Sequence, residues 1–194
     1  MKLFYAPGAC SLASHIVACE GGIAIDLEKV GLKEHRTEND SDFYAINPKG
    51  YVPALQLDDG SILTENVALL MYLGDKAGLT HQGFERYRLL EWLAFISSEI
   101  HKSFSPLFQK SPDDVAEAAK AKIVKRLTFV EERFAGEFLM GHGFCPADAY
   151  LYVMLRWCEN MGIETASLPK LTEFKARMVK RPGVSAALAA EGIS

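Results

Sequence analysis

Cys10 is the residue of this chain whose type and position best fit a chemical role. It follows the apolar run 2–5 and the turn Ala6-Pro7-Gly8-Ala9, and it precedes Ser11 and a helical pattern. This order places the thiol where a strand gives way to a helix, and there main-chain N–H groups and the helix dipole favour a negative charge. Thiolate is the reactive form of cysteine, and such a position lowers a thiol pKa from about 8.5. The alternative is an inert, half-buried cysteine.

The cysteine pattern offers Cys10 no partner nearby in the sequence. The four cysteines, at 10, 19, 145 and 158, follow neither a zinc-site spacing nor a C-x-x-C pattern. On a helix over 11–20, Cys10 and Cys19 are roughly 13 Å apart along the axis. A disulfide needs Cα atoms within about 7 Å. If Cys10 performs redox or nucleophilic chemistry, the second thiol comes from a small molecule. No metal site is expected.

The elements that must position Cys10 alternate between strand and helix patterns. Strands are predicted over 2–5, 25–30, 52–57 and 61–63, and helices over 11–20 and from 64 onward. A polar loop over 33–42 leads into a short helix that ends at 45. Asp58-Asp59-Gly60 joins the last two strands as a hairpin, because Asp-Gly supplies the positive φ that such a turn requires. The pattern indicates a compact α/β domain over 1–77.

The rest of the chain has a helical pattern throughout. Residues 74–83 are rich in glycine and polar residues and form the predicted linker. Helices are predicted over 84–101, 111–134, 146–158, 171–179 and 184–191. The helix over 146–158 is apolar on nearly all sides, so we expect it to be central and buried. The sequence therefore predicts an all-α domain over 84–194.

Composition excludes several classes of function. The chain has 194 residues, of which 49% are hydrophobic, and this is enough for one large domain or two small ones. The net charge of −4 argues against nucleic acid as the main partner. No segment approaches the roughly 20 apolar residues of a membrane span. No signal peptide is expected from the first residues, so the predicted location is the cytoplasm.

Several motifs, in order along essentially the whole chain, resemble the cytosolic glutathione S-transferases and most closely their bacterial beta class. The motifs are Tyr5-x-Pro7-Gly8-Ala9-Cys10-Ser11, Asn47-Pro48-Lys49-Gly50-Tyr51-Val52-Pro53-Ala54-Leu55, Leu63-Thr64-Glu65-Asn66, Ile100-His101-Lys102-x-Phe104-x-Pro106-Leu107-Phe108, Ala147-Asp148-Ala149-Tyr150-Leu151 and Arg181-Pro182-x-Val184. The resemblance implies a thioredoxin-like N-terminal domain, an all-helical C-terminal domain, and a homodimer with an active site in each domain cleft.

The resemblance also implies how an extended tripeptide would be held. A cis Val52-Pro53 bond would turn the N–H and C=O of Val52 toward the cysteinyl backbone of glutathione. Glu65 and Asn66 would receive the γ-glutamyl head at a helix N-terminus, although Thr64-Glu65 alone is more often only a helix cap. The implied glutathione-binding residues are Cys10, His35, Val52, Pro53, Glu65, Asn66, Ser98, Glu99, His101 and Lys102. Of these, Ser98 and Glu99 would reach the ligand from the side of the dimer partner.

Catalytic roles are implied for Cys10, Ser11 and His101. A His101 imidazolium would favour the thiolate through charge and hydrogen bonding. The hydrophobic substrate would lie against Tyr5, Phe104 and Phe108.

The sequence departs from the family pattern at three positions. Asn66 stands where many relatives have serine, and His35 where they often have lysine, so we expect help from His35 toward the glycyl carboxylate to be weaker or pH-dependent. Cys145 replaces a hydroxyl helix cap, while Asp148 remains for the reciprocal bond. We expect this replacement to cost at most about 1 kcal/mol.

The predicted function is conjugation of glutathione thiolate to hydrophobic electrophiles, together with glutathione-dependent thiol–disulfide exchange through Cys10. Glutathione is the co-substrate, and no further cofactor is expected. Two alternatives stay open. The chain could be a non-catalytic binding or stress protein on the same scaffold, or a specialised dehalogenase, isomerase or peroxidase that uses glutathione.

Overall fold

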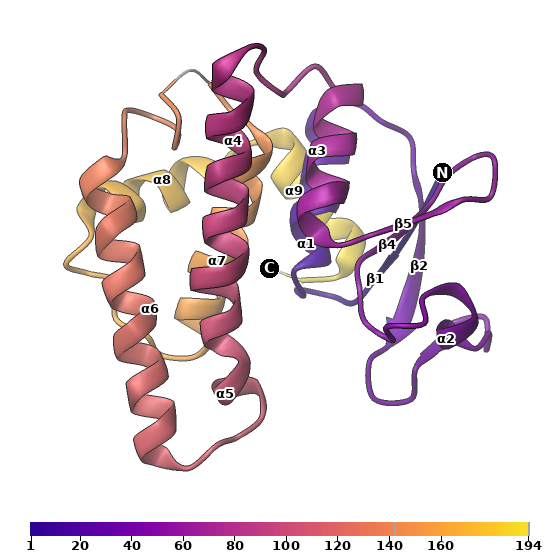
Figure 1. Ribbon diagram of the computed structural model, residues 1–194, viewed down its shortest axis with the longest axis horizontal. Helices are drawn as coiled ribbons and strands as arrows, with labels where there is room; N and C mark the ends of the chain where they lie inside the picture. The colour runs from indigo at the N-terminus through magenta and orange to yellow at the C-terminus, as the bar shows by residue number, and fades with distance from the viewer. Residues whose placement is uncertain (142, 194) are drawn as a thin grey trace. The chain divides into compact units, whose positions relative to one another are not determined.

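The computed structural model describes residues 1–141 and 143–193, and the chain divides into two compact units. The first unit comprises Met1–Thr80 together with the segment that begins at Lys180, and the second comprises His81–Val179 (Figure 1). The structure thus differs from the predicted second domain of 84–194. Positions 142 and 194 of that range lie outside the described residues.

The last helix explains this difference. Helix α9 (Pro182–Glu191) belongs to the first unit because it packs against helix α1 (Ser11–Glu20). The Glu20 carboxylate accepts a hydrogen bond from the N–H of Gly183 at 3.1 Å and pairs with Arg181 at 2.5 Å. A Cβ at position 183 would lie 2.7 Å from the main-chain nitrogen of Glu20, so this close approach requires glycine. The helical pattern predicted α9 itself, but not the unit against which it packs.

A five-stranded mixed sheet forms the first unit, in the order β3-β2-β1-β4-β5. The strands are β1 (Lys2–Tyr5), β2 (Asp26–Gly31), β3 (Arg36–Thr37), β4 (Ala54–Gln56) and β5 (Ile62–Thr64). Strand β1 is parallel to β2 and antiparallel to β4. Leu3 is fully buried and pairs in register with Leu27 on one side and Leu55 on the other. The predicted α/β class of this part of the chain is confirmed.

The predicted hairpin is present in the sheet, and two other details differ from the prediction. The hairpin between β4 and β5 is confirmed, with Gly60 at φ 85°. Strand β4 begins at Ala54, two residues later than predicted, because Val52 and Pro53 lie in the turn before it. Strand β3 was not predicted, since its two residues lie in a polar stretch without apolar alternation.

The helices of the first unit place one predicted site residue just before the start of each of two helices. Helix α1 runs over the predicted residues and buries Leu12 and Ile16 completely. The short helix α2 (Phe43–Ile46) follows the polar loop, and helix α3 (Asn66–Lys76) follows β5. Cys10 is therefore the residue before α1, and Glu65 is the residue before α3.

The second unit is all-helical, as predicted. It contains α4 (Phe84–Phe95), α5 (Ser105–Phe108), α6 (Asp113–Arg133), α7 (Pro146–Asn160) and α8 (Pro169–Val179). Helix α7 is buried on nearly all sides, and Tyr150 and Tyr152 are fully buried within it. No helix within the described part of the chain has the length and apolar character needed to cross a membrane.

The predicted helix over 84–101 changes its hydrogen-bond pattern after Phe95. A π-helical turn covers Ile96–Ile100, and a 3₁₀ turn covers His101–Phe104. The hydroxyls of Ser98 and Ser103 each donate to a carbonyl four residues earlier, at 2.9 Å and 2.7 Å. Such bonds compete with the regular helical pattern, and π-helical turns often occur at functional sites. The sequence pattern did not reveal this change.

Candidate active site

The thiol of Cys10 lies where the sequence predicted, at the start of α1. Its Sγ donates to the main-chain carbonyl of Val52 at 3.6 Å, and its side chain is 9% exposed. The Val52-Pro53 peptide bond is cis, which confirms the geometry implied by the family resemblance. The structure thus brings together the thiol and the segment predicted to pair with an extended peptide.

A buried asparagine supports this segment. The Asn47 side chain donates to the carbonyl of Tyr51 at 2.7 Å, and Asn47 is 1% exposed. The Asn47 side-chain oxygen also accepts from the N–H of Lys49 at 3.2 Å. Asn47 belongs to the quoted motif, but the sequence did not indicate that its role is to fix the turn before Val52.

Glu65 is the charged residue nearest the start of α3, and its backbone has φ 72°, which is rarely adopted outside glycine. Non-glycine residues in such strained conformations are concentrated at functional sites. The Glu65 carboxylate accepts from the Lys49 ammonium at 2.5 Å and from the Tyr51 hydroxyl at 2.8 Å. The hydrogen bond to Glu65, and then burial, raise the pKa of Tyr51, so its phenol stays protonated at neutral pH. Lys49 and Tyr51 are site residues that the sequence analysis missed, although both lie in the quoted motif.

Asn66 has a different role from the one implied. Its side-chain amide donates to the main-chain carbonyl of Cys10 at 3.1 Å, and its oxygen accepts from the Ser14 hydroxyl at 2.8 Å. Asn66 is 7% exposed, so its amide ties α3 to α1 inside the protein. A ligand at this helix start would meet the main-chain N–H groups of α3 rather than the Asn66 amide.

The catalytic role expected for Ser11 does not fit the structure. Ser11 is fully buried, and its hydroxyl both donates to the carbonyl and accepts from the N–H of Ala6, each at 3.3 Å. Its position directly after Cys10 suggested an exposed helix start, but the helix turns the Ser11 side chain inward. Tyr5 is 8% exposed, and burial followed by the charge of Glu191 raises its pKa, so it remains a phenol.

His35 lies beside the turn that precedes Val52. Its Nδ1 is 2.9 Å from the carbonyl oxygen of Gly50, and its ring centroid is 4.5 Å from that of Tyr44. The backbone of His35 has φ 51°, so His35 is, with Glu65, a second non-glycine residue of this site that has a positive φ. His35 is therefore near the predicted binding segment, and its role toward the glycyl carboxylate stays a prediction.

A buried ion pair behind the Cys10 turn was missed entirely. His15 of α1 and Glu191 of α9 are 3% and 6% exposed, and the His15 Nδ1 lies 3.0 Å from the Glu191 Oε1. The other carboxylate oxygen accepts from the N–H of Gly8 at 2.9 Å. Burial alone would lower the pKa of His15, but hydrogen bonds to Cys19 and Glu191 outweigh it and raise the pKa to about 9. No sequence signal links residues this far apart.

His101 lies in the second unit and is neutral at pH 7, which contradicts the expected imidazolium. Burial, followed by the charge of Lys102, lowers the pKa of His101 to about 4. Its Nδ1 is 2.6 Å from the hydroxyl oxygen of Tyr150, and its ring packs edge-on against Trp157 with centroids 5.0 Å apart. A lone histidine in a sequence gives no sign of such burial, so the charge state could not be predicted.

Phe104 and Phe108, two of the three aromatic residues predicted to face a hydrophobic substrate, differ in their exposure. Phe104 is fully buried, with its ring centroid 5.3 Å from that of Trp157, and this contradicts a lining role. Phe108 is 53% exposed and packs edge-on against the same Trp157 at 4.8 Å. Phe108 is therefore the member of the pair that a substrate could contact.

The neighbouring polar candidates lie along the π-helical turn and just after it. Glu99 pairs with Arg126 of α6, with 2.7 Å between carboxylate and guanidinium. Ser98 and Lys102 are exposed, and the Ser98 hydroxyl donates a hydrogen bond to the carbonyl of Ala94. Their implied contacts with glutathione stay predictions.

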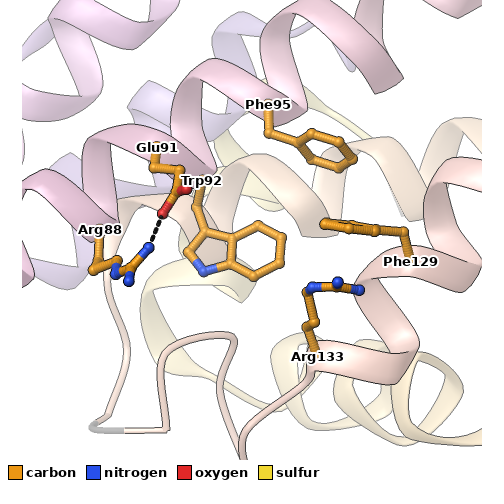
Figure 2. Close-up of a pocket in the computed structure, with 6 residues that line it drawn as sticks. All are labelled: Arg88, Glu91, Trp92, Phe95, Phe129 and Arg133. Carbon is orange, nitrogen blue, oxygen red and sulfur yellow. Dashed lines mark hydrogen bonds and ion pairs between the residues drawn. The ribbon is translucent and has the colours of Figure 1, made fainter.

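An aromatic pocket of about 300 Å³ lies between α4 and α6, and the sequence analysis did not predict it. Figure 2 shows its lining side chains, with Arg133 against the face of Phe129; they are Arg88, Glu91, Trp92, Phe95, Phe129 and Arg133. The Arg133 guanidinium is 3.7 Å from the Phe129 ring centroid, and Arg88 pairs with Glu91 at 2.8 Å. The pocket is apolar at its centre and charged at its edges. Within residues 1–141 and 143–193, no three acidic, histidine or cysteine side chains gather as metal ligands.

We expect the free energy of unfolding to fall on both sides of pH 6.5. His101 has a folded pKa of about 4 against 6.5 for an ordinary histidine. Its contribution is complete above pH 6.5 and is lost as the pH falls toward 4, because only the unfolded chain then takes up the proton. His15 has a folded pKa of about 9, so its contribution is complete below pH 6.5 and is lost as the pH rises toward 9. Each loss, when complete, is on the order of 3 kcal/mol.

Urea unfolding at pH 5, 6.5 and 8.5 measures both effects. The His101→Asn variant should unfold with a smaller difference between pH 5 and 6.5, while its difference between pH 6.5 and 8.5 stays as in the parent protein. If the stability difference between pH 5 and pH 6.5 is the same in this variant as in the parent protein, His101 does not titrate as the structure implies.

Comparison with known proteins finds similarity to glutathione S-transferases in both parts of the chain. The family model described as "Glutathione S-transferase, N-terminal domain" matches residues 8–76, and that described as "Glutathione S-transferase, C-terminal domain" matches residues 95–182. The chain is 44% identical over 200 residues to glutathione S-transferase GstA of Escherichia coli O157:H7, with all of both chains covered.

Solved structures show the same likeness. A bacterial beta class glutathione S-transferase from Sphingomonas chungbukensis is 44% identical, with 100% of both chains covered and a TM-score of 0.95. A sphingomonad glutathione S-transferase complexed with glutathione has the same identity, coverage and TM-score. Both of these structures are named as glutathione S-transferases, and one of them holds glutathione.

Proposed function

The chain belongs to the glutathione S-transferase family, and from this premise we propose that it binds glutathione at Cys10, Val52 and Glu65 and conjugates it through its sulfur to hydrophobic electrophiles. The observation that carries the proposal is the arrangement in the first unit, where the Cys10 thiol lies 3.6 Å from the Val52 carbonyl oxygen. Glu65 stands at the start of α3 on the same unit. The relative that is complexed with glutathione supports the choice of ligand.

The three parts of the tripeptide match three features of the site. The main chain at Val52 and Pro53 offers an edge to which the extended cysteinyl portion can pair. The start of α3 offers main-chain N–H groups and the positive end of a helix dipole to the γ-glutamyl carboxylate. The exposed Glu65 carboxylate can accept from the γ-glutamyl ammonium. The glycyl carboxylate would lie near His35, which is beside the turn before Val52.

Conjugation requires glutathione as its thiolate. The thiol proton passes to solvent, the thiolate attacks an electrophilic carbon, and the leaving group departs with the bonding electrons. The start of α1 favours negative charge at the sulfur, and binding holds the two reactants together. Because Ser11 is buried and His101 is neutral, we assign the stabilisation of the thiolate to the main chain of α1 and to Cys10.

Thiol–disulfide exchange is the second activity that we propose. The Cys10 thiolate attacks a disulfide that contains glutathione, and a mixed disulfide forms while the other thiolate leaves. A second glutathione thiolate then attacks the mixed disulfide, which releases oxidised glutathione and restores Cys10. No cofactor is needed for either activity, because glutathione supplies both the nucleophile and the reducing equivalents.

Replacing Glu65 by glutamine should weaken glutathione binding by about 10- to 100-fold, because a charge-assisted hydrogen bond to the ligand ammonium is replaced by a neutral one. Isothermal titration calorimetry with glutathione measures the dissociation constant. Glu117→Gln is the matched control, since Glu117 is an exposed carboxylate on α6 with a lysine partner.

The same titration tests the proposed function as a whole. Absence of measurable binding to the parent protein would refute the transferase proposal and leave a binding scaffold. Equal affinities for the Glu65→Gln variant and the parent would instead remove Glu65 from the site.

We also propose that the chain forms a homodimer through α4. Phe84 and Tyr87 are each 67% exposed, and Leu90 is 41% exposed, so one face of this helix shows three large hydrophobic side chains to solvent. Monomeric proteins rarely expose apolar side chains in a continuous patch. A second copy of the chain would cover them. Sedimentation equilibrium measures the mass, and a monomer at micromolar concentration would refute this proposal.

A further inference from the structure

The Lys49 ammonium is held by three different groups beside the start of α3. Its Nζ lies 2.5 Å from the Glu65 Oε1 and donates to the Thr64 hydroxyl at 3.0 Å. The same nitrogen is 5.9 Å from the Tyr51 ring centroid, a distance at which a cation is attracted to an aromatic face. Thr64, Glu65 and Tyr51 thus form a binding place for a positively charged group, here called the ammonium cradle.

The main chain fixes this cradle, whereas Lys49 reaches it through a flexible side chain. Glu65 has a positive φ and precedes α3, and the Tyr51 hydroxyl donates to its Oε1 at 2.8 Å. The hydrogen bond to Glu65 raises the pKa of Lys49, so this group stays an ammonium. The side chains of Lys49 and Glu65 are 44% and 56% exposed, and ion pairs with such exposure are weak. Lys49 can therefore leave the cradle when another cation arrives.

The ligand of the proposed function brings such a cation. The γ-glutamyl head carries an ammonium, and Glu65 is the carboxylate that we assign to it. Two ammonium groups beside one carboxylate share its attraction and repel each other, because like charges within about 4–6 Å disfavour one another. Glutathione must therefore displace Lys49 or bind against its charge. A ligand without this ammonium leaves the pair of Lys49 and Glu65 undisturbed.

We propose that Lys49 is an internal competitor of the ligand, which limits both the affinity of the site for glutathione and its selectivity for a free α-amino group. This inference rests on the proposed function and names a specificity-determining residue of the same site. The thioether product of conjugation keeps the γ-glutamyl head, so Lys49 competes with the product in the same way. Its return to Glu65 favours release of the product.

Isothermal titration calorimetry with two ligands tests the competition. The ligands are glutathione and glutaryl-cysteinylglycine, which has a hydrogen in place of the γ-glutamyl ammonium, both under reducing conditions at pH 7. Lys49→Met removes the charge and keeps an unbranched side chain. This variant should bind glutathione about two- to fivefold more tightly than the parent, the range expected for an exposed ion pair. Its affinity for the glutaryl peptide should be equal to that of the parent or lower.

Lys76→Met is the matched control for the loss of a positive charge. Lys76 is exposed and is the last residue of α3, so it lies about 15 Å along the helix from Asn66. This distance exceeds the screening length of about 8 Å at physiological salt, so both affinities should stay at the parent values.

The outcomes separate this inference from the proposed function. A Lys49→Met variant that binds glutathione no more tightly than the parent would overturn the competition, and so would an equal gain for both ligands. In either case, binding of glutathione to the parent and its weakening in Glu65→Gln would leave the proposed function standing. Absence of glutathione binding to the parent would overturn the proposed function and this inference with it.

Discussion

Replacing Cys10 by alanine is expected to abolish glutathione-dependent disulfide reduction and to leave conjugation within about tenfold of the parent rate. Exchange requires a protein sulfur to form the mixed disulfide, and alanine has none. Conjugation requires only that glutathione itself be bound as a thiolate. The start of α1 still favours negative charge in the variant, at a worth of about 1 kcal/mol. A coupled glutathione reductase assay measures the first activity, and a chlorinated nitroaromatic substrate measures the second.

Cys10→Ser is the matched control for this result. Its hydroxyl can donate to a bound thiolate but cannot form a disulfide, so it should behave like Cys10→Ala in exchange and retain at least as much conjugation. Disulfide reductase turnover at the parent rate in Cys10→Ala would contradict the assignment of Cys10. Loss of conjugation in both variants, with glutathione binding intact, would mean that the Cys10 sulfur itself is needed for both activities.

Replacing Asp148 by alanine should lower the free energy of unfolding by about 2–5 kcal/mol. The fully buried Asp148 carboxylate accepts from the N–H of Cys145 and from the N–H of Leu139, each at 2.8 Å. Alanine would leave two buried donors without these bonds, and each unsatisfied buried group costs about 1–3 kcal/mol. Urea unfolding followed by circular dichroism measures the loss. The sequence analysis assigned Asp148 to the cap of α7, and the bond to Leu139 is an addition from the structure.

Two further variants of the same cap serve as comparisons, because each should lose less stability than Asp148→Ala. Asp148→Asn keeps one acceptor oxygen, so its loss should be smaller than that of Asp148→Ala. Cys145→Ser changes the cap by at most about 1 kcal/mol. Stabilities of Asp148→Ala and the parent that agree within 0.5 kcal/mol, roughly the effect of an ordinary surface substitution, would show that the cap does not hold α7.

The sequence predicted most of the fold because its patterns are local. The limits of α1, the Asp-Gly hairpin and the buried character of α7 follow from residues that are neighbours in the chain. The unpredicted parts depend on contacts between distant residues or on the balance of hydrogen bonds within a turn. The packing of α9 on α1 and the π-helical turn after Phe95 are of these two kinds.

The candidate site shows the same division. Motifs led to Cys10, Val52 and Glu65, and the structure places Cys10 and Glu65 just before helix starts and Val52 in the turn before β4. A motif does not indicate how deeply its side chains are buried. For this reason the predicted roles of Ser11 and His101 are not supported by the structure. The partners of Glu65 and the pairing of His15 with Glu191 became visible only when side chains were placed in space.

The packing of α9 against α1 has a consequence for biosynthesis. The strands β1 to β5 leave the ribosome first, but the helix that supplies Glu191 and contacts Glu20 is translated after the whole second unit. Domains usually fold as units in the order of their synthesis. Here the N-terminal unit reaches its final packing only after the polypeptide beyond residue 180 has been made, so it is not complete until the second unit has also been translated.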